Sequence, residues 1–150
     1  MLAAIEALPP GQVGDPARPY LEVVVALDRP EPRIALGLAL RGLAHAALDV
    51  SDGLAGDLLH ILERSHMRAD VDVDAVPRSQ ALRKLPLDVQ RQCALAGGDD
   101  YELIFTAPPH ARDAILDAGA RAHVAATRIG TITALRHAPD WSRASELDAV

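Results

Sequence analysis

Two short acidic segments contain the side chains of this sequence that are best suited to chemistry. In the first, "LDVSDGL", an apolar run ends at Asp49, Ser51 and Asp52, and a second apolar run begins after Gly53. The free N–H groups at a helix start attract anions, but two carboxylates would repel a bare phosphate. Mg²⁺ resolves this conflict, because it binds one or two carboxylates together with waters and substrate phosphates. The first segment therefore predicts a metal–phosphate site.

The second acidic segment, "AGGDDYEL", has the same character. Gly97 and Gly98 allow a tight turn, and Asp99 and Asp100 follow directly. Glu102 comes two residues after Asp100, so on a strand the two side chains would share one face. Two junctions of this kind in one short chain suggest two walls of a single magnesium–phosphate site.

Each junction also has a purely structural interpretation. Ser51 or Asp52 can cap the following helix, which stabilises a helix by about 1 kcal/mol without any function. A plain turn would explain both glycines and one aspartate of the second segment. Asp49 favours the functional interpretation, because a carboxylate in or just after a buried strand needs a partner.

The elements that position these segments follow from the spacing of apolar residues. Alternating Asp and Val at 69–79 predict a strand with one solvated face, and Ala75 and Ala81 exclude a calcium loop. Prolines and glycines predict a loop at 9–19. Helices are expected at 31–42, 53–65, 86–97 and 109–118, the last ending before Gly119, and strands at 21–26, 45–50, 69–79, 101–107 and 122–135. Strands that alternate with helices predict an α/β (α+β) fold.

The composition narrows the function classes. A net charge of −6 argues against nucleic acid and anionic membranes as partners. The single Cys93 excludes an internal disulfide, fits a reducing cytoplasm, and is expected to be a small core residue. No apolar run reaches the roughly 18 residues of a membrane span, and the start lacks the basic region of a signal peptide. We therefore expect a cytoplasmic protein.

Taken together, "RGLAHAALDVSDGLAGDLLHILERS", "DVDVDAVPRS" and "ALAGGDDYELIFTAPP" resemble, in order and spacing, the carboxyl-terminal half of thiamine-monophosphate kinase. The lead-in "PEPRIALGLALRG" and the late "RIGTI" extend the resemblance over 29–132. Single pieces recur in the wider superfamily of aminoimidazole ribonucleotide synthetase, selenide water dikinase and a hydrogenase maturation factor. The resemblance implies the fold of the aminoimidazole ribonucleotide synthetase C-terminal domain, a mixed β-sheet packed with helices.

The resemblance also implies residue roles. Enzymes of this family transfer the γ-phosphoryl group of ATP to thiamine monophosphate, which yields thiamine diphosphate, and Mg²⁺ ions neutralise the phosphates. By motif position, Asp49 and Asp52 would bind Mg²⁺ and Ser51 would contact ATP. The substrate-binding residues would be Asp99, where the family often has Glu, with Asp100 and Glu102. No residue would act as a covalent nucleophile.

The resemblance is incomplete at both edges. The family enzyme has an amino-terminal domain that dimerises, carries further metal-binding aspartates and holds much of the ATP. Its ending, which includes an aromatic residue against the thiamine, differs from the tail that contains Trp141. We therefore expect a segment or linker at 1–28, a kinase C-terminal-like domain at 29–135 and a poorly defined tail at 136–150.

Three functional interpretations follow from this organisation. The first is the substrate-side half of a thiamine-phosphate kinase, inactive without an N-terminal ATP-binding half on the same or a separate chain and part of a homodimer. The second is a non-catalytic interaction or remnant domain of the same superfamily. The third is a superfamily member with another substrate, an aminoimidazole-type or carbamoyl-phosphate-type ligand.

Overall fold

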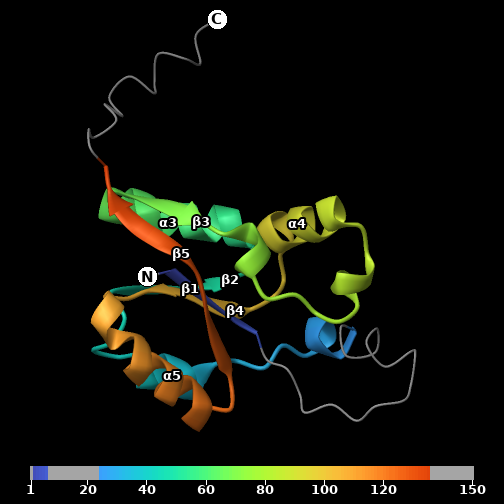
Figure 1. Ribbon diagram of the computed structural model, residues 1–150. Helices are drawn as coiled ribbons and strands as arrows, with labels where there is room; N and C mark the ends of the chain where they lie inside the picture. Colours follow the sequence, from blue (N-terminus) through green and yellow to red (C-terminus); the bar gives the residue numbers. More distant parts are fainter. Residues whose placement is uncertain (1, 7–23, 136–150) are drawn as a thin grey trace, which may run out of the picture.

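The computed structural model describes residues 2–6 and 24–135, which form a five-stranded sheet with helices on both faces (Figure 1). The strands are β1 (Leu2–Glu6), β2 (Ala46–Val50), β3 (Met67–Val71), β4 (Glu102–Thr106) and β5 (Ala125–Ala134). The α-helices are α2 (Ile34–Ala39), α3 (Leu54–Ser65), α4 (Leu87–Ala96) and α5 (Arg112–Arg121). Three 3₁₀ turns are η1 (Val73–Ala75), η2 (Leu82–Lys84) and η3 (Pro109–Ala111).

The strand order is β2-β4-β1-β5-β3, and all four described strand pairs are antiparallel. The predicted α+β class is confirmed, and its sheet is antiparallel rather than mixed. In the β2–β4 pair, Asp49 lies opposite Leu103 and Val50 lies opposite Glu102. The carboxyl end of β2 therefore adjoins the beginning of β4.

The two faces of the sheet bury separate hydrophobic clusters. Ile104 and Phe105 are adjacent on β4 and fully buried, and successive strand residues point to opposite faces. Phe105 packs with residues of α2 and α5, whereas Ile104 packs with residues of α3. Helices α2 and α5 thus cover one face of the sheet, and α3 with α4 lies over the other (Figure 1).

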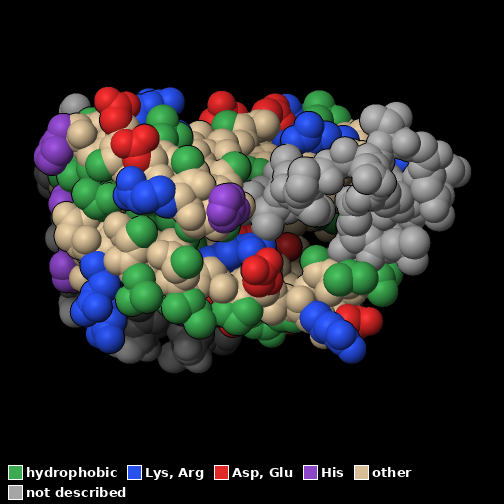
Figure 2. Space-filling model, turned by 90° about the horizontal axis from the view of Figure 1, so that it is seen from below, with side chains coloured by type: hydrophobic (Ala, Val, Ile, Leu, Met, Phe, Trp, Pro, Cys, Tyr) green, Lys and Arg blue, Asp and Glu red, His purple; other side chains and the backbone are tan. Residues whose placement is uncertain are grey.

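The outer surface of α2 and α5 is mixed in character. Seen from below, hydrophobic side chains are dispersed among charged and polar ones on this face (Figure 2). Leu38 of α2 and Leu116 of α5 are among the exposed apolar residues. Among the described residues, no helix has the length and apolar content to cross a lipid bilayer.

The first part of the chain corrects one prediction and adds one strand. Residues 24–28 are helical, with the N–H of Arg29 donating to the carbonyl of Val25 at 2.9 Å, where the sequence predicted a strand at 21–26. The middle position of the sheet belongs instead to β1, for which the sequence predicted no element. Residues 2–6 therefore belong to the same sheet as the later strands. The predicted loop at 9–19 and the tail with Trp141 lie outside the described residues.

The predicted strand at 69–79 is wrong beyond Val71. The Asp72 carboxylate accepts the N–H groups of Asp74 and Ala75 at 3.1 and 3.3 Å, which starts η1. Such a local side-chain bond competes with strand pairing. Asp74 is ion-paired with Arg78 and Arg91 rather than simply solvated, so this segment folds back against α4.

Two further residues differ from expectation. Cys93 is exposed on α4 rather than part of the core. Gly119 lies inside α5 rather than after its end. The helix packs tightly at this point on the segment that follows it. A Cβ at Gly119 would lie 2.6 Å from the carbonyl oxygen of Val124. Close packing, and not helix termination, therefore requires this glycine.

Candidate functional site

The fold brings the two acidic junctions together. The N–H of Asp99 donates to the carbonyl of Ser51 at 2.8 Å, and the N–H of Tyr101 donates to the carbonyl of Val50 at 2.8 Å. These bonds continue the β2–β4 pairing beyond the ends of both strands. Both segments therefore form one continuous acidic rim, an arrangement that two walls of a single site require.

Glycines make this close approach possible. A Cβ at Gly98 would lie 2.7 Å from the carbonyl oxygen of Ser51. Gly53 has a φ of +114°, and a Cβ there would lie 3.2 Å from the backbone of Ala96. Asp99 and Tyr101 adopt φ values of 64° and 51°, the left-handed region that side chains disfavour. Non-glycine residues in this region cluster at functional sites.

Asp49 lies on the exposed face of an edge strand. β2 is the outermost strand beside β4, and its residues alternate between exposed and less exposed positions. The prediction of a buried strand at 45–50 is therefore wrong, and so is the argument that burial forces Asp49 to have a partner. Its exposure leaves the carboxylate accessible to a ligand.

The negative charges of both junctions converge on one phenol. The hydroxyl of Tyr101 donates to Oδ1 of Asp99 at 3.3 Å. The charge of Asp99 and this hydrogen bond raise the pKa of Tyr101, with further contributions from desolvation and from the charges of Asp49 and Asp52. The carboxylates of three aspartates from two segments thus all lie close enough to the Tyr101 hydroxyl to disfavour loss of its proton.

Asp100 lies in an unfavourable environment for a negative charge. Although the residue keeps an exposed surface, desolvation of its carboxyl raises the pKa of Asp100 to about 6. The neighbouring charges of Glu102 and Asp99 act in the same direction. A cation at this rim would relieve that repulsion.

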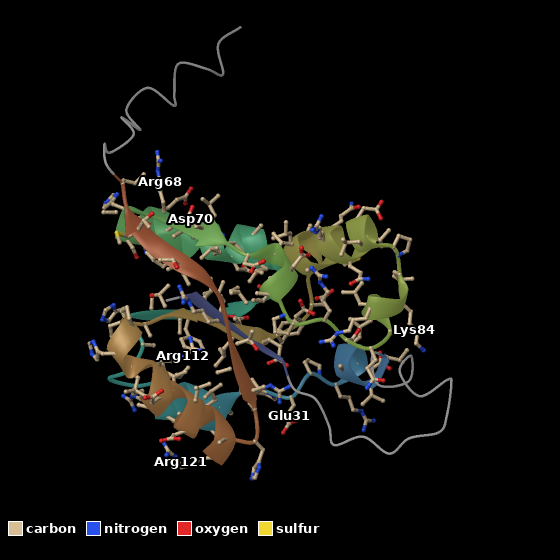
Figure 3. The ribbon with its side chains drawn as sticks, viewed as in Figure 1. Glu31, Arg68, Asp70, Lys84, Arg112 and Arg121 are labelled. Atoms are coloured by element: carbon tan, nitrogen blue, oxygen red, sulfur yellow. The ribbon has the colours of Figure 1, made fainter. Side chains whose placement is uncertain are left out.

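Glu102 is held by a partner that the sequence analysis did not identify. Arg33 donates from Nε to Oε2 at 2.9 Å and from Nη2 to Oε1 at 2.6 Å, so both carboxylate oxygens are engaged. Arg33 also donates to Glu31 at 3.2 Å, and Glu31 itself lies at the surface (Figure 3). The Arg33 in "PEPR", in the first turn of the helix predicted at 31–42, was the only signal for this pair.

The start of α3 uses a different cap from the one predicted. The N-cap residue is Gly53 and no side chain caps the helix, so the prediction for Ser51 or Asp52 is wrong. Instead, Oδ2 of Asp57 accepts the N–H groups of Ser51 and Asp52 at 3.0 and 3.1 Å. The sequence analysis missed Asp57, whose only signal was an acidic residue in the first turn of an amphipathic helix.

A cavity of about 370 Å³ adjoins the acidic rim. Asp49 and Tyr101 contribute to its wall on the side of the rim. The rest of its lining is mainly apolar and consists of Pro30, Pro32, Arg33, Ile34, Gly37 and Leu103. The guanidinium of Arg33 is already neutralised by Glu102, so among the described residues that line this cavity the unpaired charge is that of Asp49.

The rim fits a metal only together with other ligands. Within the described part of the chain, no group of three or more His, Cys, Asp or Glu side chains could hold a metal ion alone. Mg²⁺ commonly takes only one or two carboxylates and completes its shell with waters and phosphates. Asp49 and Asp52, both exposed, match this requirement.

Comparison with known proteins shows the family of this chain. The model of the family "AIR synthase related protein, C-terminal domain" matches residues 12–139, and the chain belongs to this family. The thiamine-monophosphate kinase of Haemophilus influenzae is 50% identical over 105 residues, which cover 69% of this chain and 32% of the relative. That of Salmonella typhimurium is 49% identical over 107 residues, 71% of this chain and 33% of the relative. The chain thus spans about a third of these relatives.

Solved structures give the same result. The crystal structure of thiamine-monophosphate kinase from Stenotrophomonas maltophilia K279a superposes with a TM-score of 0.80 and 41% identity, over 89% of this chain and 47% of that one. The structure of AaThiL complexed with AMPPCP and TMP superposes with a TM-score of 0.62 and 26% identity, over 83% and 38% of the two chains. The predicted resemblance to thiamine-monophosphate kinases is confirmed.

Proposed function

We propose that this chain forms the substrate-side half of a thiamine-phosphate kinase, which transfers the γ-phosphoryl group of ATP to thiamine monophosphate. The observation that carries this proposal is the 2.8 Å bond from Asp99 N–H to the Ser51 carbonyl, which joins the two acidic junctions. A kinase relative of this fold has been solved with AMPPCP, an ATP analogue, and TMP. Phosphoryl transfer depends mainly on positioning and charge neutralisation, which an acidic rim with metal ions supplies.

The residues of the rim divide into two groups. Asp49 and Asp52 would hold Mg²⁺, which would neutralise the charge of the phosphates. Ser51 would contact ATP between them. On the other wall, Asp99 and Asp100 would face thiamine monophosphate. Glu102 belongs to the same wall, and its pairing with Arg33 gives it a supporting position there.

The cavity beside the rim suits the thiamine end of the substrate. The thiazolium ring is flat and positively charged, so it favours apolar walls, an aromatic face and a nearby carboxylate. The cavity offers prolines and Tyr101 for the first two contacts, and Asp99, which accepts the hydroxyl of Tyr101 at 3.3 Å, brings a carboxylate beside them. A phosphate on the same substrate would then lie toward the metal ligands.

The complete enzyme requires more than this chain. The relatives are about three times as long as the matched segment, so we expect an N-terminal half, on the same or a separate chain, to supply further ligands for Mg²⁺ and ATP. We expect a homodimer as the working assembly. The described half alone should show little or no turnover.

A chimaera tests the proposal directly. This chain's matched segment would replace the corresponding segment of the Haemophilus influenzae kinase, and ADP release would be measured with thiamine monophosphate. Asp52→Asn and Asp99→Asn should each lower kcat/KM by about a hundredfold. Asp70→Asn is the matched control, because Asp70 is an exposed aspartate on β3 at the other edge of the sheet (Figure 3). Unchanged affinity for Mg²⁺ and thiamine monophosphate in both site variants would overturn the site assignment.

A ligand panel separates the remaining interpretations. Thermal shifts of this chain with MgCl₂ would be compared for thiamine monophosphate, aminoimidazole ribonucleotide and carbamoyl phosphate. A ligand at a hundredfold excess over its Kd stabilises the folded state by about 2.7 kcal/mol. Stabilisation by one of the other two ligands alone would indicate a different substrate. Stabilisation by none would favour the non-catalytic domain.

A further inference from the structure

Asp57 is a buried carboxylate outside the groups assigned above. It lies in the first turn of α3 with a relative exposure of 3%, and among the described residues it is the only acidic side chain in the buried set. A buried carboxylate is unfavourable unless hydrogen bonds or charges compensate it. Its partners therefore indicate why the fold tolerates it.

The Asp57 carboxylate holds the first acidic junction at two points, and its backbone adds an ordinary helical bond. Oδ2 accepts the N–H groups of Ser51 and Asp52 at 3.0 and 3.1 Å. The N–H of Asp57 donates to the carbonyl of Gly53 at 3.0 Å, the first turn of the helix. Bonds to a charged acceptor are about twice as strong as neutral ones, and the helix N-terminus favours a negative charge.

The second junction depends on the first. The Ser51 carbonyl accepts the N–H of Asp99, and the Val50 carbonyl accepts the N–H of Tyr101. Hydrogen bonds thus lead from the Asp57 carboxylate through Ser51 to Asp99. The backbones of Gly98 and Ser51 lie so close that no Cβ would fit between them. A shift of the first junction toward Gly98 must therefore displace the second.

These contacts also determine which charge the rim attracts. The N–H groups of Ser51 and Asp52, which could have bound a phosphate directly, are turned inward to Asp57. The exposed carboxylates of Asp49 and Asp52 remain on the outer surface. These two N–H groups are therefore unavailable to an anion, and the outer charges of the junction are those of two carboxylates.

We propose that Asp57 is a positioning residue that fixes both acidic junctions and makes their outer surface a cation site. The positioning stands on the hydrogen bonds alone, whereas its effect on metal binding rests on the proposed function. Asp57 touches neither metal nor substrate, and it acts through Ser51, Asp52 and Asp99.

Two variants of this chain and one control test the proposal. Asp57→Leu removes the acceptors, and Asp57→Asn keeps the shape and one acceptor oxygen but loses the charge. Leu58→Ala is the control, because Leu58 is the next residue of α3 and is buried in the core, and its apolar side chain makes no hydrogen bond to the junctions. Amide hydrogen exchange would be measured at Ser51, Asp52, Asp99 and Tyr101, relative to Ile104 and Phe105 in the core.

In Asp57→Leu we expect exchange at the four junction amides to rise about a hundredfold relative to the core amides, and in Asp57→Asn about tenfold. Leu58→Ala should leave these ratios unchanged, since a weaker core affects all six amides alike. Asp57→Asn decides the question if the leucine variant does not fold. Junction amides that keep their wild-type ratios in the Asp57 variants would overturn the positioning role.

The metal readout is separate. In the chimaera with the Haemophilus influenzae kinase, the Kd for Mn²⁺ with thiamine monophosphate, measured by water proton relaxation, should rise about tenfold in Asp57→Asn and stay constant in Leu58→Ala. An unchanged Kd in Asp57→Asn would overturn the cation part of the proposal. Absence of Mn²⁺ binding by the chimaera without substitutions would contradict the proposed function, and the exchange data would still decide the role of Asp57.

Discussion

Arg33 donates hydrogen bonds to both carboxylate oxygens of Glu102, at 2.9 Å from Nε and 2.6 Å from Nη2. The pair connects the residue before α2 with the first residue of β4, beside the cavity and the acidic rim. The Arg33 side chain is 9% exposed and that of Glu102 is 21% exposed, so solvent screens their attraction only partly. Arg33 therefore helps to hold the beginning of β4, the strand that follows the second acidic junction.

Breaking this pair should destabilise the protein measurably. Because removal of one partner leaves a half-buried charge without its bonds, Glu102→Gln and Arg33→Met should each lower the free energy of unfolding by about 1–3 kcal/mol. Urea denaturation of both single variants and the double variant gives the coupling energy. A coupling energy near zero would contradict the pairing. The exposed pair of Arg91 and Asp74 is the comparison, and Arg91→Met should have little effect.

The close contact at Gly98 predicts a second result. In Gly98→Ala the new methyl group would lie 2.7 Å from the Ser51 carbonyl oxygen, which must separate the junctions. We expect the free energy of unfolding, measured by urea denaturation, to fall by about 1–3 kcal/mol. Gly56→Ala is the control, since nothing lies within 4 Å of its Cβ position and alanine favours a helix by about 0.5–1 kcal/mol. Equal stability of Gly98→Ala and wild type would disprove the contact.

Asp100 predicts how stability depends on pH. Its pKa is raised from 3.8 to about 6, so the folded state binds a proton more tightly than the unfolded state. The free energy of unfolding should therefore fall as pH rises from about 4 to about 6, and this loss persists above pH 6. Asp100→Asn should remove this fall and gain on the order of 1 kcal/mol at pH 7.5, a value reduced by solvent screening.

Urea midpoints at pH 4.5 and pH 7.5 check this expectation, because the two values bracket most of the titration. The same substitution at Asp70, on β3 at the far edge of the sheet, is the control. A wild-type protein and an Asp100→Asn variant with identical pH dependence would show that the carboxyl titrates normally.

Filling the cavity tests its part in substrate binding. Gly37 lies on α2 in the cavity wall, and a Cβ there would meet only Leu103 Cδ1 at 3.8 Å. Gly37→Leu should keep the fold, because leucine favours a helix more than glycine does by about 1 kcal/mol. The Kd for thiamine monophosphate, measured by equilibrium dialysis, should rise by about tenfold. Gly56→Leu, on the exposed surface of α3, should bind thiamine monophosphate as the wild type does. A wild-type Kd in Gly37→Leu as well would show that the cavity takes no part in substrate binding.

Much of the fold could be predicted from local patterns. Apolar periodicity predicted α3 and α4, and the prolines after Thr106 predicted the end of β4. Failures occurred where a partner distant in sequence decides the conformation. Residues 2–6 became the middle strand because β4 and β5 pair with them, and nothing in their own residues shows this. The failure at Asp72 has a local cause instead, because hydrogen bonds from its side chain to the N–H groups two and three residues later replaced the strand that alternation predicted.

The candidate site shows the same division. The sequence by itself determined the two acidic junctions and the family, because residue types and their spacing can be recognised without knowledge of the fold. Only the tertiary structure decided that Asp57 holds Ser51 and Asp52, that Arg33 holds Glu102, and that Asp49 is exposed on an edge strand. The physical reason is that hydrogen bonds and burial depend on distances between residues, and antiparallel pairing of β2 with β4 sets those distances.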